Sequence, residues 1–207
     1  MEVVIRESAE SACELVAGLI AGALKCKPHL VLGLATGRTM ETVYADLVRL
    51  HKTDKLDFSL CRTFNLDEYI GLAPADPNSY RCYMNDHLFK RVNIDIRNTH
   101  LPDGMAADLE AECLRYEALI RECNGIDLQL LGIGKTGHIG FNEPLSALLS
   151  RTRPKALTPV TIRENDPLFK DPSRMPRRAI TMGVGTIMEC KRLLVLVTGR
   201  PKAEILA

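Results

Sequence analysis

Residues 29–39 read HLVLGLATGRT, a short apolar run followed by small and polar residues. Such a run, bounded by Pro28 on one side and by turn residues on the other, predicts a buried strand over 29–34. Beyond the turn, apolar residues recur at helical spacing, at Met40, Val43, Leu47 and Leu50. The stretch therefore predicts a strand, a tight loop and a helix that Thr39 would cap.

The same alternation recurs along the chain. Further strands are predicted at residues 61–66, 126–131 and 192–197, with a weaker one at 96–101. Helical spacing follows Ser8 and returns at residues 78–89, 109–123 and 183–189. Strands that alternate with helices predict an α/β fold, because each crossover returns the chain to a parallel sheet. We expect a Rossmann-like, mostly parallel sheet with helices on both faces.

No linker rich in proline, glycine or serine divides the chain, so residues 1–207 are expected to form a single domain. The least regular part is residues 151–178, which carry five prolines. We expect loops and short helices there, over the edge of the sheet.

Composition excludes several classes of protein. The 207 residues are 46% apolar and 26% charged, with a net charge of +1, so no overall field would hold nucleic acid or an anionic membrane. The seven cysteines are scattered and form no CxxC pair, which predicts a reducing compartment and no structural zinc. The longest apolar stretch, residues 15–24, is about half of what a membrane-spanning helix needs. A cytoplasmic protein is expected.

The loop ATGRT, residues 35–39, follows the first predicted strand. Small residues let backbone N–H groups approach an anion, and the helix N-terminus adds partial positive charge. A phosphate is therefore a natural ligand, with contacts available from Thr36, Gly37, Arg38 and Thr39. A plain strand-to-helix turn is an equally weighted alternative for this loop taken alone.

The segment FNLDEY, residues 64–69, places two carboxylates at the end of a predicted strand. Alternation sends Asp67 and Glu68 in opposite directions, so at most one of them faces a shared pocket. A carboxylate there is well placed as a general base. A solvated strand end is the alternative.

The third loop, GIGKTGHIGFNEP at residues 132–144, carries the strongest signal. Its glycines would let a ligand lie against the backbone. His138 can carry a proton near neutral pH, and Glu143 could orient the imidazole. A histidine flanked by glycines has little local bulk to pack against, which favours a functional role over a structural one.

Together the motifs resemble the glucosamine-6-phosphate deaminases, also called glucosamine-6-phosphate isomerases. The similar stretches are LGLATG (32–37), TFNLDEYIGL (63–72), LGIGKTGHIGFNEP (131–144), SRTR (150–153), TMGVGTI (181–187) and TGRPKA (198–203). The resemblance implies conversion of glucosamine 6-phosphate and water to fructose 6-phosphate and ammonia, without a metal or organic cofactor. The related 6-phosphogluconolactonases differ after their GH pair.

The resemblance also implies residue roles. Asp67 would move a proton from C2 to C1 through an enolamine. His138 would move the proton that opens the pyranose ring, and Glu143 would hold it in orientation. The substrate phosphate would contact the loop from Thr36 to Thr39 and Lys202, which follows the last predicted strand.

The chain departs from the family at several positions. Thr136 stands where the family usually has Asp or Asn to assist His138. Arg38 and Met40 replace a glycine and a proline in the loop that would bind the phosphate. Ile162 and Pro167 stand where the family often has arginines, and Arg163 is a candidate substitute. These departures leave open an isomerase or deaminase of a different sugar phosphate. A non-catalytic sugar-phosphate sensor is a third reading, against which the intact Asp67, His138 and Glu143 argue.

Some family members are hexamers activated by N-acetylglucosamine 6-phosphate through a basic stretch. Ser146, Arg153 and Lys155 match it, so the resemblance raises an allosteric site and a homo-oligomer as expectations. Family members usually continue for a few tens of residues beyond the position that matches residue 207. The chain is accordingly expected to be short at its C-terminus.

Overall fold

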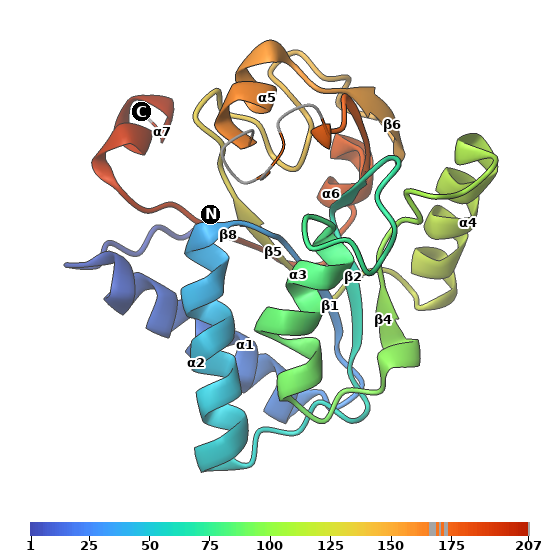
Figure 1. Cartoon of the computed structure of the whole chain (residues 1–207). Helices are drawn as coiled ribbons and strands as arrows, with labels where there is room; N and C mark the ends of the chain where they lie inside the picture. The colour runs from blue at the N-terminus through green and yellow to red at the C-terminus, as the bar shows by residue number, and fades with distance from the viewer. Residues whose placement is uncertain (166–168, 170, 172–173, 207) are drawn as a thin grey trace.

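A parallel five-stranded sheet forms the centre of the computed structural model, which describes residues 1–165, 169, 171 and 174–206 (Figure 1). The strands lie in the order β4-β2-β1-β5-β8, and each neighbouring pair is parallel. Their bounds are β1 Val31–Leu34, β2 Arg62–Asn65, β4 Thr99–His100, β5 Leu128–Gly132 and β8 Leu193–Leu196. The mostly parallel α/β sheet expected from the sequence is confirmed.

The helices other than α5 and α7 fall where apolar residues recur at helical spacing. They are α1 Ala9–Cys26, α2 Arg38–Asp54, α3 Tyr80–His87, α4 Leu109–Glu122, α5 Pro159–Asn165, α6 Val184–Met188 and α7 Ala203–Leu206. The weak strand expected at 96–101 is wrong in its first half. Asp95 accepts a hydrogen bond from the backbone N–H of Arg97 at 2.9 Å and so caps a 3-10 turn over Ile96–Asn98.

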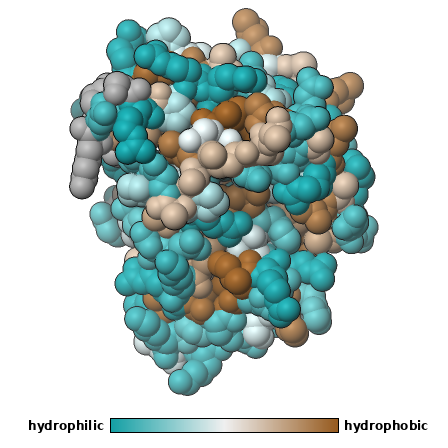
Figure 2. All heavy atoms as spheres, turned by 45° about the vertical axis from the view of Figure 1, so that its right-hand side comes forward, coloured by the Kyte–Doolittle hydropathy of each residue, from teal (hydrophilic) through white to brown (hydrophobic). Residues whose placement is uncertain are grey.

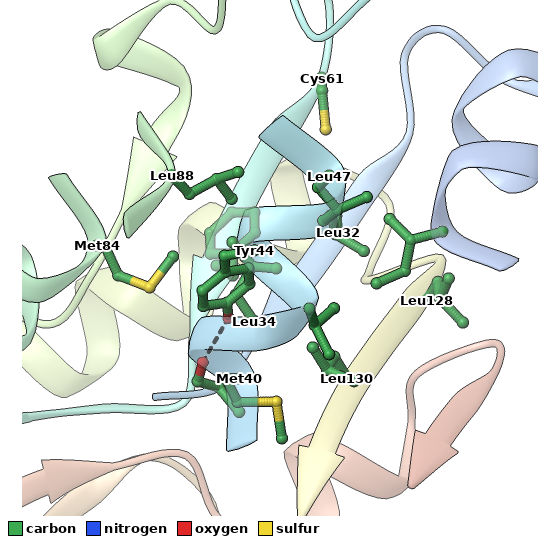
Figure 3. Packing of buried hydrophobic residues seen from close by; sticks show 14 of the residues in the cluster. Leu32, Leu34, Met40, Tyr44, Leu47, Cys61, Met84, Leu88, Leu128 and Leu130 are labelled. Carbon is green, nitrogen blue, oxygen red and sulfur yellow. Dashed lines mark hydrogen bonds between the residues drawn. The ribbon is translucent and has the colours of Figure 1, made fainter. Parts of the chain in front are cut away.

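Helices cover both faces of this sheet. Leu32 and Leu34 of β1 point to the face that α2 covers, where they pack with Tyr44 (Figure 3). On the opposite face, the ring of Tyr116 from α4 meets Phe64 of β2 edge-on, with 5.7 Å between centroids. Burying such side chains on two faces drives folding, at about 1.5–3 kcal/mol for each large apolar residue.

A second sheet was not expected from the sequence. It is antiparallel, with the order β3-β7-β6, and consists of β3 Asp67–Tyr69, β7 Arg178–Thr181 and β6 Arg153–Ala156. The expectation of loops and short helices over 151–178 is therefore wrong at β6, although α5 fits it. Pro154 hides this strand in the sequence, and it is tolerated because β6 lies at an edge of the sheet.

The chain crosses from one sheet to the other at Leu66. Its N–H donates to Leu34 of the parallel sheet at 3.2 Å, and its carbonyl accepts from Met182, the residue after β7, at 2.7 Å. The strand that carries the NLDEY motif thus ends at Asn65, and Asp67 begins a new strand. Asp67 consequently lies where the two sheets meet.

The face of the molecule shown in Figure 2 is mainly hydrophilic, with apolar side chains gathered into separate small areas. All seven cysteines are free thiols. Within the part of the chain that the structure describes, no helix is long and apolar enough to cross a membrane.

Candidate active site

A cleft of about 690 Å³ opens at the carboxyl ends of the parallel strands. Loops after β1, β5 and β8 contribute to its walls, together with the junction of the two sheets. Ligands bind at this edge in open α/β sheets. Of the residues singled out from the sequence, the cleft is lined by Thr36, Gly37, Arg38, Thr39, Asp67, His138 and Lys202. Segments more than 160 residues apart in the sequence, from Thr36 to Lys202, therefore converge as the sequence led us to expect.

Asp67 and Glu68 point in opposite directions, as strand alternation predicts. Asp67 lines the cleft and is buried. Glu68 turns away and caps α3: its carboxylate accepts from the backbone N–H of Tyr80 and of Arg81, each at 2.9 Å. Only Asp67 is therefore placed to act on a ligand, whereas Glu68 stabilises the helix N-terminus.

The environment of the two carboxyl groups disfavours their charged forms. Burial, and next the neighbouring charge of Glu68, raise the pKa of Asp67 to about 8. Burial raises the pKa of Glu68 to about 7, although the hydrogen bonds that it accepts from backbone N–H groups lower the pKa. A carboxyl group with a pKa near 8 is a much stronger base than an ordinary aspartate once it is ionised.

His138 is held through Thr136. The Thr136 hydroxyl lies 2.8 Å from His138 Nδ1 and donates to Glu143 Oε2 at 2.7 Å. A carboxylate can only accept, so the single hydroxyl proton goes to Glu143 and the oxygen accepts the Nδ1–H. The proton of the neutral imidazole is thereby assigned to Nδ1, and Nε2 is the nitrogen that can take up a proton.

Glu143 is fixed on its other side by α5. Its Oε1 accepts from Thr158 at 3.1 Å and from Thr161 at 2.8 Å. Burial raises the pKa of Glu143, but the threonine hydroxyls and the nearby imidazole outweigh it and hold the pKa below its ordinary value. Glu143 thus stays ionised near neutral pH and can orient His138 through Thr136.

The glycines of this loop serve the protein's own side chains. A Cβ on Gly134 would come within 2.0 Å of the His138 ring, and one on Gly140 would come within 3.2 Å of Asp67 Oδ2. The expectation that these glycines leave room for a ligand is therefore corrected at Gly134, because the imidazole itself occupies that space.

The loop at residues 35–39, hereafter the phosphate loop, leads into α2. Gly37 is the N-cap, with φ of 124°, and no side chain caps the helix. The expectation that Thr39 caps it is wrong, because the positive φ of Gly37 lets the helix begin at Arg38. The Thr39 hydroxyl instead lies 3.2 Å from that of Thr198, after β8. The first N–H groups of α2 thus have no side-chain cap, as an anion site requires.

Several residues of the site were missed in the sequence. An aromatic wall lines the cleft beside Asp67, in which Tyr69 lies 4.8 Å from Tyr80 and 5.6 Å from Phe141 between ring centroids. The roles of Thr158 and Thr161 were missed as well. Tyr69 stands inside the NLDEY motif and could have been found there, but threonines in an irregular segment gave no signal.

The remaining candidates lie outside the cleft lining. Arg163 is exposed on α5, and Pro167 lies outside the described residues. The Ser146 hydroxyl donates to the carbonyl of Glu143 at 2.7 Å, and Arg153 donates to the Asn142 side chain at 2.9 Å. The allosteric role of Ser146, Arg153 and Lys155 stays a prediction. Across the ranges that the structure describes, no group of three or more His, Cys, Asp and Glu residues could hold a metal ion.

The fold and the cleft define an α/β protein that places a buried carboxyl group and a histidine in one cleft with a helix N-terminus. The chain belongs to the family of glucosamine-6-phosphate isomerases/6-phosphogluconolactonase, whose sequence model matches residues 5–207.

Similar proteins include the glucosamine-6-phosphate deaminase of a Geobacillus species, 47% identical over all of this chain and 82% of that protein. That of Shewanella loihica is 48% identical over 99% of this chain and 76% of its own length. A solved monomeric glucosamine-6-phosphate deaminase superposes with a TM-score of 0.97 at 45% identity, over 100% of this chain and 86% of that one. The 6-phosphogluconolactonase of Thermotoga maritima, with a TM-score of 0.72 and 22% identity over 99% and 86%, shares the fold.

Proposed function

We propose that the protein converts glucosamine 6-phosphate and water to fructose 6-phosphate and ammonia. The observation that carries the proposal is one cleft that holds Asp67, His138 and the phosphate loop. Relatives named glucosamine-6-phosphate deaminase match over nearly the whole chain. The reaction needs a base near C1 and C2, a separate proton shuttle for ring opening, and an anchor for the phosphate.

The first step opens the sugar ring. With its proton on Nδ1, His138 has Nε2 as its basic nitrogen, which would take the proton from the C1 hydroxyl and return it to the ring oxygen. Thr136 and Glu143 hold the ring in that tautomer and stabilise the imidazolium while it carries the extra proton. The product of this step is the open-chain aldehyde.

The second step moves a proton between carbons. Ionised Asp67 takes the C2 proton, which gives an enolamine, and returns it at C1, which leaves an imine carbon at C2. Water adds to that carbon and ammonia leaves, so fructose 6-phosphate remains. The burial of Asp67, which raises its pKa, also makes it basic enough for a carbon acid.

The phosphate end would be held by backbone N–H groups at the start of α2 and by cationic side chains. Arg38 and Lys202 both line the cleft, and the hydroxyls of Thr39, at the start of α2, and of Thr198, after β8, lie 3.2 Å apart. These local contacts would bind the dianion, since the net charge of +1 supplies no general attraction.

The experiment is a coupled assay that follows fructose 6-phosphate and ammonia from purified protein. Equal amounts of both products from glucosamine 6-phosphate support the proposal. Thr136 and Arg38 motivate parallel assays with other phosphorylated sugars, and faster turnover of one of them would favour the alternative substrate. Binding of glucosamine 6-phosphate without either product would instead favour a sensor.

We also infer a cytoplasmic location, supported by seven free thiols, which are typical of a protein from a reducing compartment. We further propose that the chain can form a homo-oligomer, whereas the solved relative is monomeric. Light scattering of the purified chain distinguishes the two states.

A further inference from the structure

Two tyrosine hydroxyls hold the carbonyl groups of the phosphate loop. Tyr44 of α2 donates to the carbonyl of Ala35, and Tyr83 of α3 donates to the carbonyl of Gly37 at 2.9 Å. The Gly37 carbonyl also accepts the first bond of α2, from Met40 N–H at 2.9 Å. Both carbonyls are therefore held by tyrosine side chains, that of Ala35 at a buried position and that of Gly37 at an exposed one.

The direction of these carbonyls fixes the direction of the N–H groups that follow them. A trans peptide unit is planar, and its C=O and N–H point opposite ways. The Gly37 carbonyl shares its peptide unit with the N–H of Arg38. A hydroxyl bound to that carbonyl thus aims the Arg38 N–H away from α3, in the direction that an anion at the start of α2 would need.

Gly37 makes this support necessary. Its φ of 124° lies in a region that glycine alone enters readily, and a Cβ placed there would meet no atom within 4 Å. Without a Cβ, the backbone at Gly37 has little steric restraint on the side where the peptide unit to Arg38 begins. Beyond the first bond of α2, the Tyr83 hydroxyl donates a second hydrogen bond that restrains this peptide unit.

The helix that carries Tyr83 is itself tied to the base. Glu68, adjacent to Asp67, accepts from the N–H groups of Tyr80 and Arg81 at the start of α3. The Tyr83 hydroxyl then spans to Gly37, 46 residues away in sequence. One short helix thus connects the strand that presents Asp67 to the phosphate loop.

We propose that Tyr83 is a positioning residue, which orients the Gly37–Arg38 peptide unit for phosphate and sets the phosphate loop relative to Asp67. The inference rests on the proposed function for its substrate, but its central claim concerns phosphate binding alone. It adds to the reaction a residue that acts through the backbone of the loop.

The test is Tyr83→Phe, which keeps the ring and removes the hydroxyl. We expect KM for glucosamine 6-phosphate to rise about fivefold, as for the loss of one neutral hydrogen bond, with kcat within about twofold. The inhibition constant of inorganic phosphate should rise by a similar factor. An unchanged inhibition constant would overturn the proposal.

Tyr116→Phe is the matched control. The Tyr116 hydroxyl also donates to carbonyls, those of Asn65 at 2.7 Å and His100 at 3.2 Å, but the residue does not line the cleft. We expect a lower melting temperature for this variant with phosphate binding unchanged. Equal weakening of phosphate binding in both variants would show a general loss of stability and overturn the positioning role.

Two further measurements are needed. The first distinguishes positioning by Tyr83 from direct contact with the ligand, and the second tests phosphate binding independently of the proposed function. In phosphate-free protein, the amide resonance of Arg38 should shift in Tyr83→Phe and stay in place in Tyr116→Phe. An unmoved resonance with weaker phosphate binding would mean that Tyr83 contacts the ligand itself. Calorimetric titration with inorganic phosphate gives a result even if no sugar phosphate is turned over.

Discussion

His138 and Glu143 do not contact each other directly: Nδ1 and Oε2 are 3.9 Å apart, and the hydroxyl of Thr136 bridges them. A carboxylate in direct contact could take the imidazole proton. A threonine hydroxyl passes on the influence of the carboxylate through one more hydrogen bond while remaining neutral itself. The orientation of the His138 ring thus depends on Thr136, at the position where the resemblance leads us to expect Asp or Asn.

Thr136→Val should lower kcat about tenfold or more, because valine has the same shape but can neither accept from Nδ1 nor donate to Glu143. Thr136→Ser, which keeps the hydroxyl, should retain activity within about threefold. Steady-state kinetics at a fixed pH compare the two. Equal rates for the valine and serine variants would show that the bridge is dispensable.

Gly134→Ala should displace the imidazole, since the added Cβ would stand within 2.0 Å of its ring atoms. We expect a loss of kcat of about 100-fold in a protein that still folds. Gly22→Ala is the control, because Gly22 is exposed within α1 and a Cβ there meets nothing within 4 Å. That variant should keep full activity and gain about 0.5–1 kcal/mol of stability. Full activity of Gly134→Ala would refute the placement of His138.

Asp67→Asn should abolish turnover, with kcat reduced about 1,000-fold or more, because an amide cannot take a proton from C2. The side chain keeps its shape, so binding of glucosamine 6-phosphate should be largely retained. Calorimetry on the variant measures that affinity directly. Parallel loss of affinity and turnover would mean that Asp67 supports the cleft structurally.

The pH dependence of kcat/KM follows from the raised pKa of Asp67, about 8. The base works only when ionised, so kcat/KM should climb about tenfold for each pH unit below about 7 and level off above 8. A pH–rate profile from pH 5.5 to 9.5 tests this. A profile already flat at pH 6 would show that Asp67 ionises as an ordinary aspartate.

Stability should change with pH in the opposite sense. Between the unfolded pKa of about 4 and the folded value of about 8, the folded state keeps a proton on Asp67 that the unfolded state releases. The free energy of unfolding therefore falls as pH rises through this window. Melting temperatures at pH 5 and 8 should differ more for the natural protein than for Asp67→Asn, and an equal difference would contradict the shift.

Local patterns were sufficient for the main sheet. Runs such as residues 30–34 indicate a buried strand because they contain no polar side chain, and α1, α2 and α4 show an apolar stripe. The second sheet gave no such signal. Its strands have three or four residues, and β6 carries Pro154, so periodicity has too few positions in which to appear.

The sequence by itself determined the chemical groups of the site. An aspartate after a strand, a histidine in a glycine-rich loop and a small-residue loop before a helix are local features, and parallel topology brings such loops to one edge of the sheet.

Only the tertiary structure decided which atoms touch. The bridge from Thr136 to Glu143, the support of Glu143 by Thr161 and the contact of Tyr83 with Gly37 join residues 7, 18 and 46 positions apart. A hydrogen bond forms only when donor and acceptor are placed to within a few tenths of an ångström. That placement is set by how the two sheets, α3 and α5 pack together. Spacing along the chain contains no information at that scale, so the roles of Thr158, Thr161 and Tyr83 emerge only once the chain is folded.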